Sequence, residues 1–191
     1  MALATAKRVS ELQALSVSVV KHSRDLVLSY ISSFVAKTET AENPVPRSFP
    51  LKSLSNFVGD MVEELSVCPV RCLKAYLKRT SKIPGRPNTL FVSPRNNMKP
   101  LSKNAISFFL RDLISRYGSL DSSEGPGPRA HSVRAMATSV AFSKNCPVHK
   151  ILEAASWRTN SVFTSFYLKE LAFEKGDIHS LSPCVAAGFV S

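Results

Sequence analysis

Apolar residues recur at helical spacing near both ends of the chain, and strand-forming residues concentrate in one early segment between them. Residues 2–15 predict a helix, because good helix formers dominate there and leucines supply the large apolar positions. Residues 17–37 are rich in strand formers and predict strands on either side of a short polar turn, the second strand covering 26–36. Residues 39–61 hold three prolines that exclude a helix, so irregular structure is expected, with an edge strand allowed at 49–51.

The rest of the chain predicts a series of helices separated by loops. An apolar stripe indicates a helix from Cys68 onward, and Ser102 is placed to cap another. A Gly- and Pro-rich loop at 118–129 precedes a helix that starts at His131. The pattern further predicts a short strand at 90–92, a helix from Pro147 and a last helix capped by Asn160. The predicted fold class is therefore α+β, mainly α, with a small antiparallel β-sheet.

Basic residues clearly outnumber acidic ones in this 191-residue chain. Lysine plus arginine number 25 against 14 aspartates and glutamates, which gives a net charge of +11 and a pI near 9.8. Such an excess favours a polyanionic partner, nucleic acid first and an acidic membrane surface second. The alternative is a basic surface that serves solubility alone.

The cysteines predict free thiols, with neither a disulfide framework nor a metal site. Cys68 and Cys72 have no second pair of cysteines or histidines nearby to complete a tetrahedral site. We find no secretory signal and no run long enough to span a membrane, so an intracellular, reducing location with no membrane partner is expected. The four cysteines are Cys68, Cys72, Cys146 and Cys184.

One stretch near the C-terminus concentrates side chains suited to phosphate chemistry. His131 and Arg134 are three residues apart and therefore lie on one face of a helix. Trp157 and Tyr167 follow at about the distance of two further short helices. Together they would offer an imidazole, a guanidinium, an indole N–H and a phenol to one phosphate. This set could break a phosphodiester with a tyrosine nucleophile and no metal.

These residues and an earlier motif, in order along the chain, resemble the catalytic domain of the tyrosine recombinases, the phage-integrase superfamily. The earlier motif is Arg8-x-x-Glu11-Leu12, and the later residues are His131, Arg134, Trp157 and Tyr167. The amino-acid sequences of four segments resemble most closely the recombinases of DIRS-type and related eukaryotic mobile elements. The four segments are residues 6–12, 68–77, 90–93 and 131–139.

The resemblance implies a recombinase catalytic domain over residues 1–172 and a C-terminal tail over 173–191. It also implies double-stranded DNA as the partner, a homo-oligomer on that DNA, a nuclear location and no cofactor. The helical domain that precedes the catalytic domain in the family is not seen before Arg8, so an N-terminally truncated recombinase is expected.

By this resemblance Arg8 and Arg134 are the two arginines that clamp the nonbridging oxygens of the scissile phosphate. A planar guanidinium offers paired donors that match a phosphate, and it stays charged. The transition state carries extra negative charge, so fixed cations favour it over the ground state. The alternative for Arg8 is an i,i+3 ion pair with Glu11 on a helix surface.

The resemblance assigns a role to three further residues. His131 would accept or relay a proton, and its alternative is a structural histidine at a helix start. Trp157 would donate its indole N–H to the phosphate and pack the site, or serve only as a core anchor. Tyr167 would be the nucleophile that forms a 3′-phosphotyrosyl intermediate. It stands ten residues after Trp157, where most phage-type members have nine.

The family also uses a lysine on a β-hairpin as general acid, and Lys37, at the end of the strand predicted over 26–36, is the best match. Lys21 and Lys52 are the alternatives. A second basic set without a catalytic match predicts contacts to the DNA backbone, or else a solvated helix face. This set is Lys74, Lys78, Arg79, Lys82, Arg86, Arg95, Lys99 and Lys103.

The sequence therefore predicts DNA strand cleavage and rejoining, as in site-specific recombination or integration. Two alternatives stay open: a catalytically inactive DNA-binding remnant of a mobile-element recombinase, and a type IB topoisomerase-like enzyme. A basic structural protein with no nucleic-acid role is a more remote reading.

Overall fold

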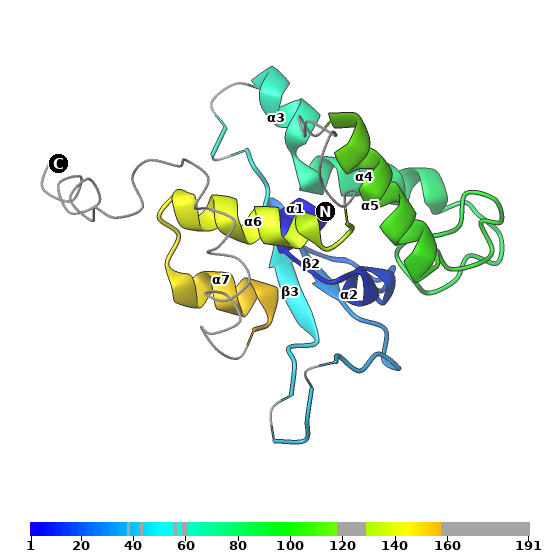
Figure 1. Cartoon of the computed structure of the whole chain (residues 1–191). Helices are drawn as coiled ribbons and strands as arrows, with labels where there is room; N and C mark the ends of the chain where they lie inside the picture. Colours follow the sequence, from blue (N-terminus) through cyan, green and yellow to red (C-terminus); the bar gives the residue numbers. More distant parts are fainter. Residues whose placement is uncertain (38, 43, 56, 59–60, 118–128, 158–191) are drawn as a thin grey trace, which may run out of the picture.

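The computed structural model describes residues 1–37, 39–42, 44–55, 57–58, 61–117 and 129–157. Short helices and a small sheet alternate along this part of the chain (Figure 1). The helices are α1 (Ala2–Thr5), α2 (Val9–Gln13), α3 (Met61–Val67), α4 (Pro69–Thr80), α5 (Lys103–Tyr117), α6 (Ser132–Ser143) and α7 (Val148–Ala155). The strands are β1 (Val20–His22), β2 (Asp25–Ser29) and β3 (Ser48–Leu51).

The three strands form one antiparallel sheet in the order β1-β2-β3. Leu26 and Leu28 of β2 face the core, because successive side chains of a strand point to opposite faces. Leu26 pairs in register with Leu51 of β3, which is also buried. The predicted edge strand at 49–51 is therefore confirmed, and Pro50 fits there since an edge strand can lack one N–H donor.

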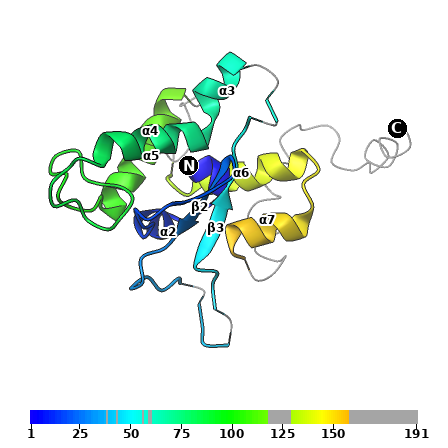
Figure 2. The same ribbon diagram turned by 180° about the vertical axis from the view of Figure 1, so that it is seen from behind.

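In the views of Figures 1 and 2 the sheet lies between α4 and α5 on one side and α6 and α7 on the other. Helix α6 packs against α7 and α1, and α5 packs against α2. Leucines from the N-terminal segment, the sheet and the later loops fill the core between these layers. Fully buried leucines are Leu15, Leu26, Leu28, Leu51 and Leu90. The mixed α and β class with a small antiparallel sheet is therefore as expected, and within the described part helices outnumber strands.

The continuous helix predicted over residues 2–15 is wrong, because the chain breaks between α1 and α2. Ala6 adopts a left-handed backbone conformation, with φ of 49°. Arg8 is extended and precedes α2, where its backbone N–H donates to the Glu11 carboxylate at 2.6 Å. That bond satisfies an N–H that a helix start would otherwise leave unpaired. The good helix formers in this segment predict a continuous helix, because propensity alone does not account for the bond from the Arg8 N–H to the Glu11 side chain.

Two strand predictions also fail in part. The strand predicted over 26–36 ends at Ser29, because Tyr30 turns into a cluster with the rings of Phe34 and Phe49. Residues 90–92 form no ladder strand. They make one isolated bridge, between Val92 and Pro100, and single backbone bonds such as Leu90 N–H to Leu15 C=O. Helix α3 was not predicted at all.

The described helices of the second half match their predicted starts closely, whereas the helix predicted to be capped by Asn160 and the tail over 173–191 lie outside the described residues. Ser102 accepts the Ala105 N–H at 3.1 Å and caps α5, as expected. Helices α6 and α7 pack against each other, and their C-terminal ends are closed in the same way. Asn145 and Ser156 are both left-handed, and the next residue donates to a carbonyl five positions back in each case. This pattern closes a helix end by satisfying its last carbonyl groups.

Within the described ranges no helix is long and apolar enough to cross a lipid bilayer.

Candidate functional site

One pocket of about 550 Å³ gathers residues from four segments far apart in the sequence. The segment joining α1 to α2 supplies Arg8, the N-terminal half of α5 supplies Lys103, and the start of α6 supplies His131 and Arg134. Trp157 completes the wall from just beyond α7. Four of the six predicted catalytic residues therefore line a single pocket, a convergence that the sequence order alone does not reveal.

A buried carboxylate ties the two arginines of this pocket together. Glu11 is 1% exposed, and its carboxylate lies 3.7 Å from the Arg8 guanidinium and 3.5 Å from the Arg134 guanidinium. The i,i+3 pair between Arg8 and Glu11 that the sequence allowed as an alternative is thus present. It is not a helix-surface pair, because Glu11 is buried and shared with Arg134, and both arginines line the pocket. One carboxylate between two guanidiniums leaves a net positive site.

The side chain of Arg134 is buried, and besides Glu11 two further groups hold its guanidinium. Its guanidinium donates to the backbone C=O of Ala155 at the end of α7. The same group lies over the ring of Trp157, 4.7 Å from the ring centroid. A guanidinium stacked on an indole gains from the negative face of the ring. Trp157 therefore packs against Arg134 in the structure, while its predicted hydrogen bond to a phosphate stays a prediction.

His131 occupies the N-cap position of α6, with an exposed side chain. It lines the site pocket and also a neighbouring one of about 660 Å³ that runs along α5. Arg111 and Arg129 line this second pocket, so positive charge extends from the arginine pair along one side of α5. We call the site pocket and this extension the basic trough.

Two predicted site residues are not brought into the pocket by the described residues. Lys37 is exposed in the connection between β2 and β3, beyond the end of the strand on which it was expected. Tyr167 lies outside the described residues. Of the two alternatives to Lys37, Lys21 is exposed on β1, and Lys52 forms an ion pair with Asp25 at 2.8 Å. The structure therefore leaves the general-acid assignment as a prediction.

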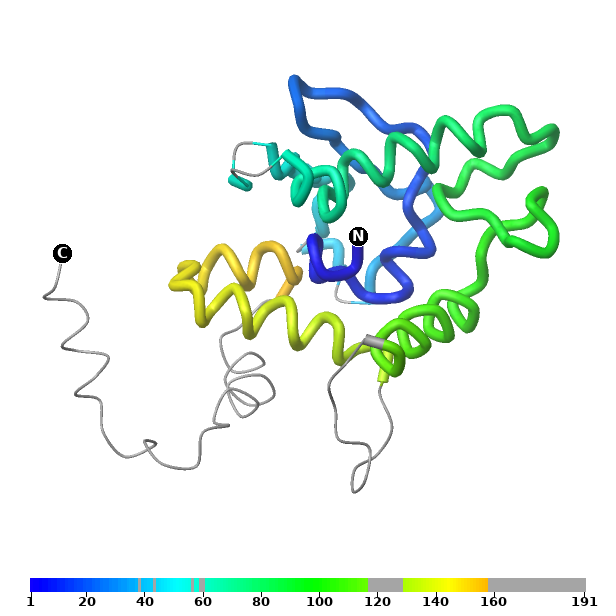
Figure 3. The backbone as a smooth tube through the Cα atoms, turned by 90° about the horizontal axis from the view of Figure 1, so that it is seen from above, coloured from blue at the N-terminus to red at the C-terminus, as the bar shows by residue number. Residues whose placement is uncertain are grey.

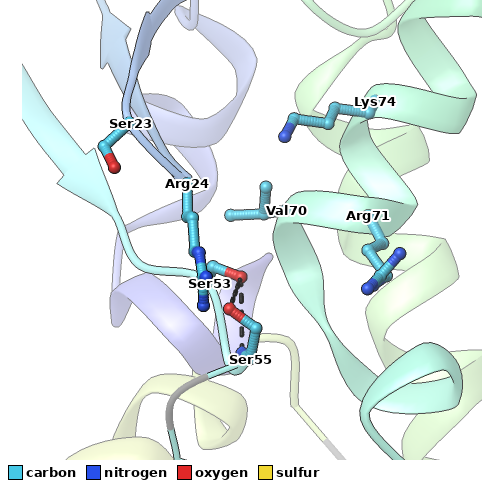
Figure 4. Close-up of a pocket in the computed structure, with 7 residues that line it drawn as sticks. All are labelled: Ser23, Arg24, Ser53, Ser55, Val70, Arg71 and Lys74. Carbon is cyan, nitrogen blue, oxygen red and sulfur yellow. Dashed lines mark hydrogen bonds between the residues drawn. The ribbon is translucent and has the colours of Figure 1, made fainter. Parts of the chain in front are cut away.

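The second basic set divides between two places. Lys103 lines the site pocket, whereas Lys74 lines a separate pocket of about 420 Å³ with Arg24 and Arg71 (Figure 4). There Arg71 also pairs with Glu64 at 2.5 Å. Figure 3 shows α4 and α6 on opposite sides of the N-terminal segment. Lys78 and Arg79 are exposed on α4.

In the described part of the chain no cluster of three or more histidine, cysteine or acidic side chains could hold a metal ion. Cys68, Cys72 and Cys146 are free thiols there, as the sequence predicts, while Cys184 lies outside the described residues.

Sequence reasoning missed a buried lysine beside Arg8. Lys7 is 9% exposed, and its ammonium donates to the Ser156 hydroxyl at 3.1 Å. The ammonium also lies 4.7 Å from the centroid of the Phe49 ring. The one available signal was its place next to Arg8 in a segment that was predicted to be a helix. In a continuous helix Lys7 and Arg8 would point in different directions, so the wrong helix prediction gave no reason to place Lys7 near the site.

Burial perturbs two groups next to the arginine pair. The pKa of Lys7 lies below its usual value, because burial disfavours the charged ammonium more than the Glu11 carboxylate favours it. The pKa of Tyr30 lies well above its usual value, because burial and then the nearby Glu11 carboxylate disfavour the phenolate. Tyr30 is therefore a neutral phenol at physiological pH.

The lowered pKa of Lys7 predicts a pH-dependent stability difference between the wild type and Lys7→Met. Between the lowered pKa and the ordinary 10.5, the unfolded chain binds a proton that the folded chain does not. Raising the pH through this window therefore favours the folded wild type. Urea unfolding from about pH 7 to 10 should show the wild type gaining stability relative to Lys7→Met. Lys150→Met, at an exposed lysine, is the control that should show no such trend. A constant difference across this range would contradict the prediction.

The fold is that of solved recombinases and integrases. The structure resembles XerA recombinase with a TM-score of 0.58 at 16% identity, covering 92% of this chain and 56% of that one. XerH site-specific recombinase bound to a palindromic difH substrate gives 0.58 at 15% identity, with coverages of 89% and 41%. A lambda integrase fragment bound to a core site gives 0.53 at 19% identity, with coverages of 93% and 52%.

These likenesses show a shared fold and leave the activity of the chain open, because the identities are low. The chain spans about half the length of the solved chains that it resembles. No protein-family model and no curated protein matches its sequence.

Proposed function

We propose that this chain cleaves and rejoins DNA strands by tyrosine recombinase chemistry. The observation that carries the proposal is the convergence of Arg8 and Arg134 on one pocket, around the shared carboxylate of Glu11. The fold shared with solved recombinases and the motif resemblance support it independently. Its finer assignments, to site-specific recombination and to DIRS-type elements, rest on the sequence resemblance.

The geometry suits a phosphodiester more than a small neutral substrate. Two guanidiniums face one pocket, and a single carboxylate offsets only part of their charge. Guanidinium groups bind phosphate oxygens in pairs of hydrogen bonds. Glu11 and Trp157 fix the guanidiniums before substrate arrives, so they need not reorganise as charge builds on the phosphorus. The extended basic trough along α5 fits a polyanion that continues beyond the reacting phosphate.

In the proposed reaction the Tyr167 phenol loses its proton, and its oxygen attacks the scissile phosphorus. The bond from phosphorus to the 5′-oxygen breaks, and that oxygen takes up a proton to become a 5′-hydroxyl. The 3′-phosphotyrosyl bond replaces the phosphodiester, so rejoining is the reverse step. His131, at the rim of the pocket, is the proposed proton acceptor. Lys37 stays the proposed proton donor on the motif resemblance.

A suicide substrate tests this proposal directly. A nicked duplex that releases a short 5′-hydroxyl strand after cleavage traps the covalent intermediate, which is seen as a protein–DNA band under denaturing conditions. The wild-type chain should form this band, and Tyr167→Phe should bind the same duplex and form none. Tyr117→Phe, at the end of α5, is the matched control and should keep the band. A covalent band from Tyr167→Phe would contradict the assignment of the nucleophile.

The inactive binding module is the second candidate function. The fold that the chain shares with solved recombinases, some of them bound to DNA, supports DNA binding without requiring cleavage. Binding without a covalent band from the wild type would support this candidate. Relaxation of supercoiled DNA without pairing of two sites would instead support the topoisomerase alternative.

DNA binding should depend steeply on salt, because phosphate contacts release counterions. The slope of log K on log salt should fall at roughly −3 to −6, corresponding to about four to six neutralised phosphates. Lys103 lines the site pocket, so Lys103→Glu should make the slope shallower by about one unit. An unchanged slope for Lys103→Glu would place the duplex elsewhere. The same replacement at Lys74 or Lys78 tests the predicted backbone contact from α4, on the other side of the N-terminal segment.

A further inference from the structure

Lys7 lies behind the arginine pair and joins the two ends of the described chain. Its ammonium contacts Ser156, which lies 149 positions later in the sequence, and the Phe49 ring of β3. Lys7 lines the site pocket, and it also lines a pocket of about 510 Å³ whose wall includes Phe49 and Ser156. Since both contacts of the ammonium belong to this other pocket, its charged end points away from the site.

Two residues at this contact, Ala6 before Lys7 and Ser156 itself, have a left-handed backbone conformation. Ala6, directly before Lys7, has φ of 49°, and Ser156 has φ of 52°. Neither is glycine, and a left-handed conformation is unfavourable for an ordinary residue because its Cβ crowds the following carbonyl oxygen. Such conformations persist where the surrounding contacts hold them in place. At Ser156 the backbone bond from the Trp157 N–H to the Leu152 C=O closes the turn, and the bond from Lys7 to the Ser156 hydroxyl is a further, side-chain contact at the same residue.

Ser156 directly precedes Trp157 and follows Ala155, so its conformation sets the place of two groups that hold Arg134. The Ala155 carbonyl accepts from the Arg134 guanidinium, and the Trp157 ring lies against that guanidinium. Beyond Trp157 the chain continues to the proposed nucleophile. A change at Ser156 is therefore passed to Arg134 through both of its neighbours.

We propose that Lys7 is a positioning residue of the site, whose ammonium fixes the turn at Ser156 and thereby orients Trp157 against Arg134. This inference rests on the proposed function only for its effect on cleavage. The link from Lys7 to Trp157 holds whether or not the chain cleaves DNA.

The chemistry of a buried ammonium makes this role specific. A hydroxyl and an aromatic face are weak partners for a full charge, so the ammonium depends on correct placement of both. The charged groups around it are the Glu11 carboxylate and the guanidiniums of Arg8 and Arg134. Across the second pocket lie the side chains of Lys52, Lys150 and Glu153. Methionine has a similar length without the charge, so it removes the contact while filling much of the same space.

The experiment is a double-replacement cycle at Lys7 and Ser156, read by the fluorescence of Trp157. Trp157 is the only tryptophan of the chain, so its emission and its quenching by acrylamide report on this one place. The variants are Lys7→Met, Ser156→Ala and the two together. Lys150→Met removes an equal charge from the wall of the same pocket and serves as the matched control.

Lys7→Met and Ser156→Ala should each make Trp157 more accessible to acrylamide, and the double variant should match the single ones. Such non-additivity is expected when two residues act through one contact. Lys150→Met should leave the quenching unchanged. The quenching of the wild type should also change with pH below 10.5 as Lys7 titrates, and that change should disappear in Lys7→Met.

If cleavage is observed, Lys7→Met should lower its rate by about 10- to 100-fold while DNA affinity stays within about twofold, the pattern of misplaced groups. Additive effects of the two replacements on Trp157, or unchanged quenching in Lys7→Met, would overturn the proposal. Absence of cleavage by the wild type would contradict the proposed function and leave the fluorescence test intact.

Discussion

Glu11→Ala is expected to destabilise the fold by about 3–5 kcal/mol, the cost of leaving buried charges without their partner. The Glu11 carboxylate accepts the backbone N–H of Arg8 and lies between the two guanidiniums of the site. Removing it exposes each guanidinium to the other with nothing between them. It also leaves the backbone N–H of Arg8, directly before α2, without its acceptor.

Glu11→Gln separates the loss of the negative charge from the loss of the hydrogen-bond acceptor. A glutamine can still accept the Arg8 N–H but carries no charge, so it should recover only part of the lost stability. Urea unfolding of the three proteins measures the difference. Glu63→Ala, at an exposed carboxylate of α3, is the control and should change stability by less than about 0.5 kcal/mol. A loss of under about 1 kcal/mol for Glu11→Ala would show that the arginines do not need its charge.

Arg134→Ala should reduce strand cleavage by a factor of about 10² or more, and reduce DNA affinity far less. Arg134 lines the pocket, and Glu11, the Ala155 carbonyl and the Trp157 ring hold its guanidinium in place. A donor fixed in this way strengthens as negative charge develops on the phosphate, so its loss falls mainly on the rate. The measurement is single-turnover cleavage of the nicked duplex beside a binding titration.

Arg134→Lys controls for charge, and it should rescue cleavage poorly because an ammonium cannot present paired donors. Arg8→Ala should show the same separation of rate from binding. Because Arg134 is also part of the packing between α6 and α7, the assays belong at a temperature where thermal unfolding shows each variant folded. Wild-type cleavage by Arg134→Ala would remove this residue from the site.

Local patterns were enough to predict most of the helices and the small sheet. The edge strand, the cap at Ser102 and the start of α4 each follow from residues within a few positions of one another. The resemblance then brought Arg8, His131, Arg134 and Trp157 together, and the structure places all four on one pocket.

The failures concern features that depend on contacts across the chain. The break at Ala6 is held by Glu11 and by Lys7, whose partner Ser156 is remote in sequence. Strand β2 ends where Tyr30 meets two phenylalanine rings, which no period-two pattern can show. Lys37 was assigned to a strand end by matching alone, and the strand stops before it. Burial of Glu11 and Lys7 is likewise a property of the whole fold.

The bond between Lys7 and Ser156 has a consequence for synthesis. The site pocket takes one wall from the first ten residues and the others from residues that leave the ribosome much later. During translation, Arg8 therefore cannot form its part of the pocket until nearly the whole described chain has emerged from the ribosome. Contacts of such high sequence separation form late and slowly during folding. If the chain cleaves DNA as proposed, nascent chains and chains truncated before Trp157 should therefore be inert towards DNA.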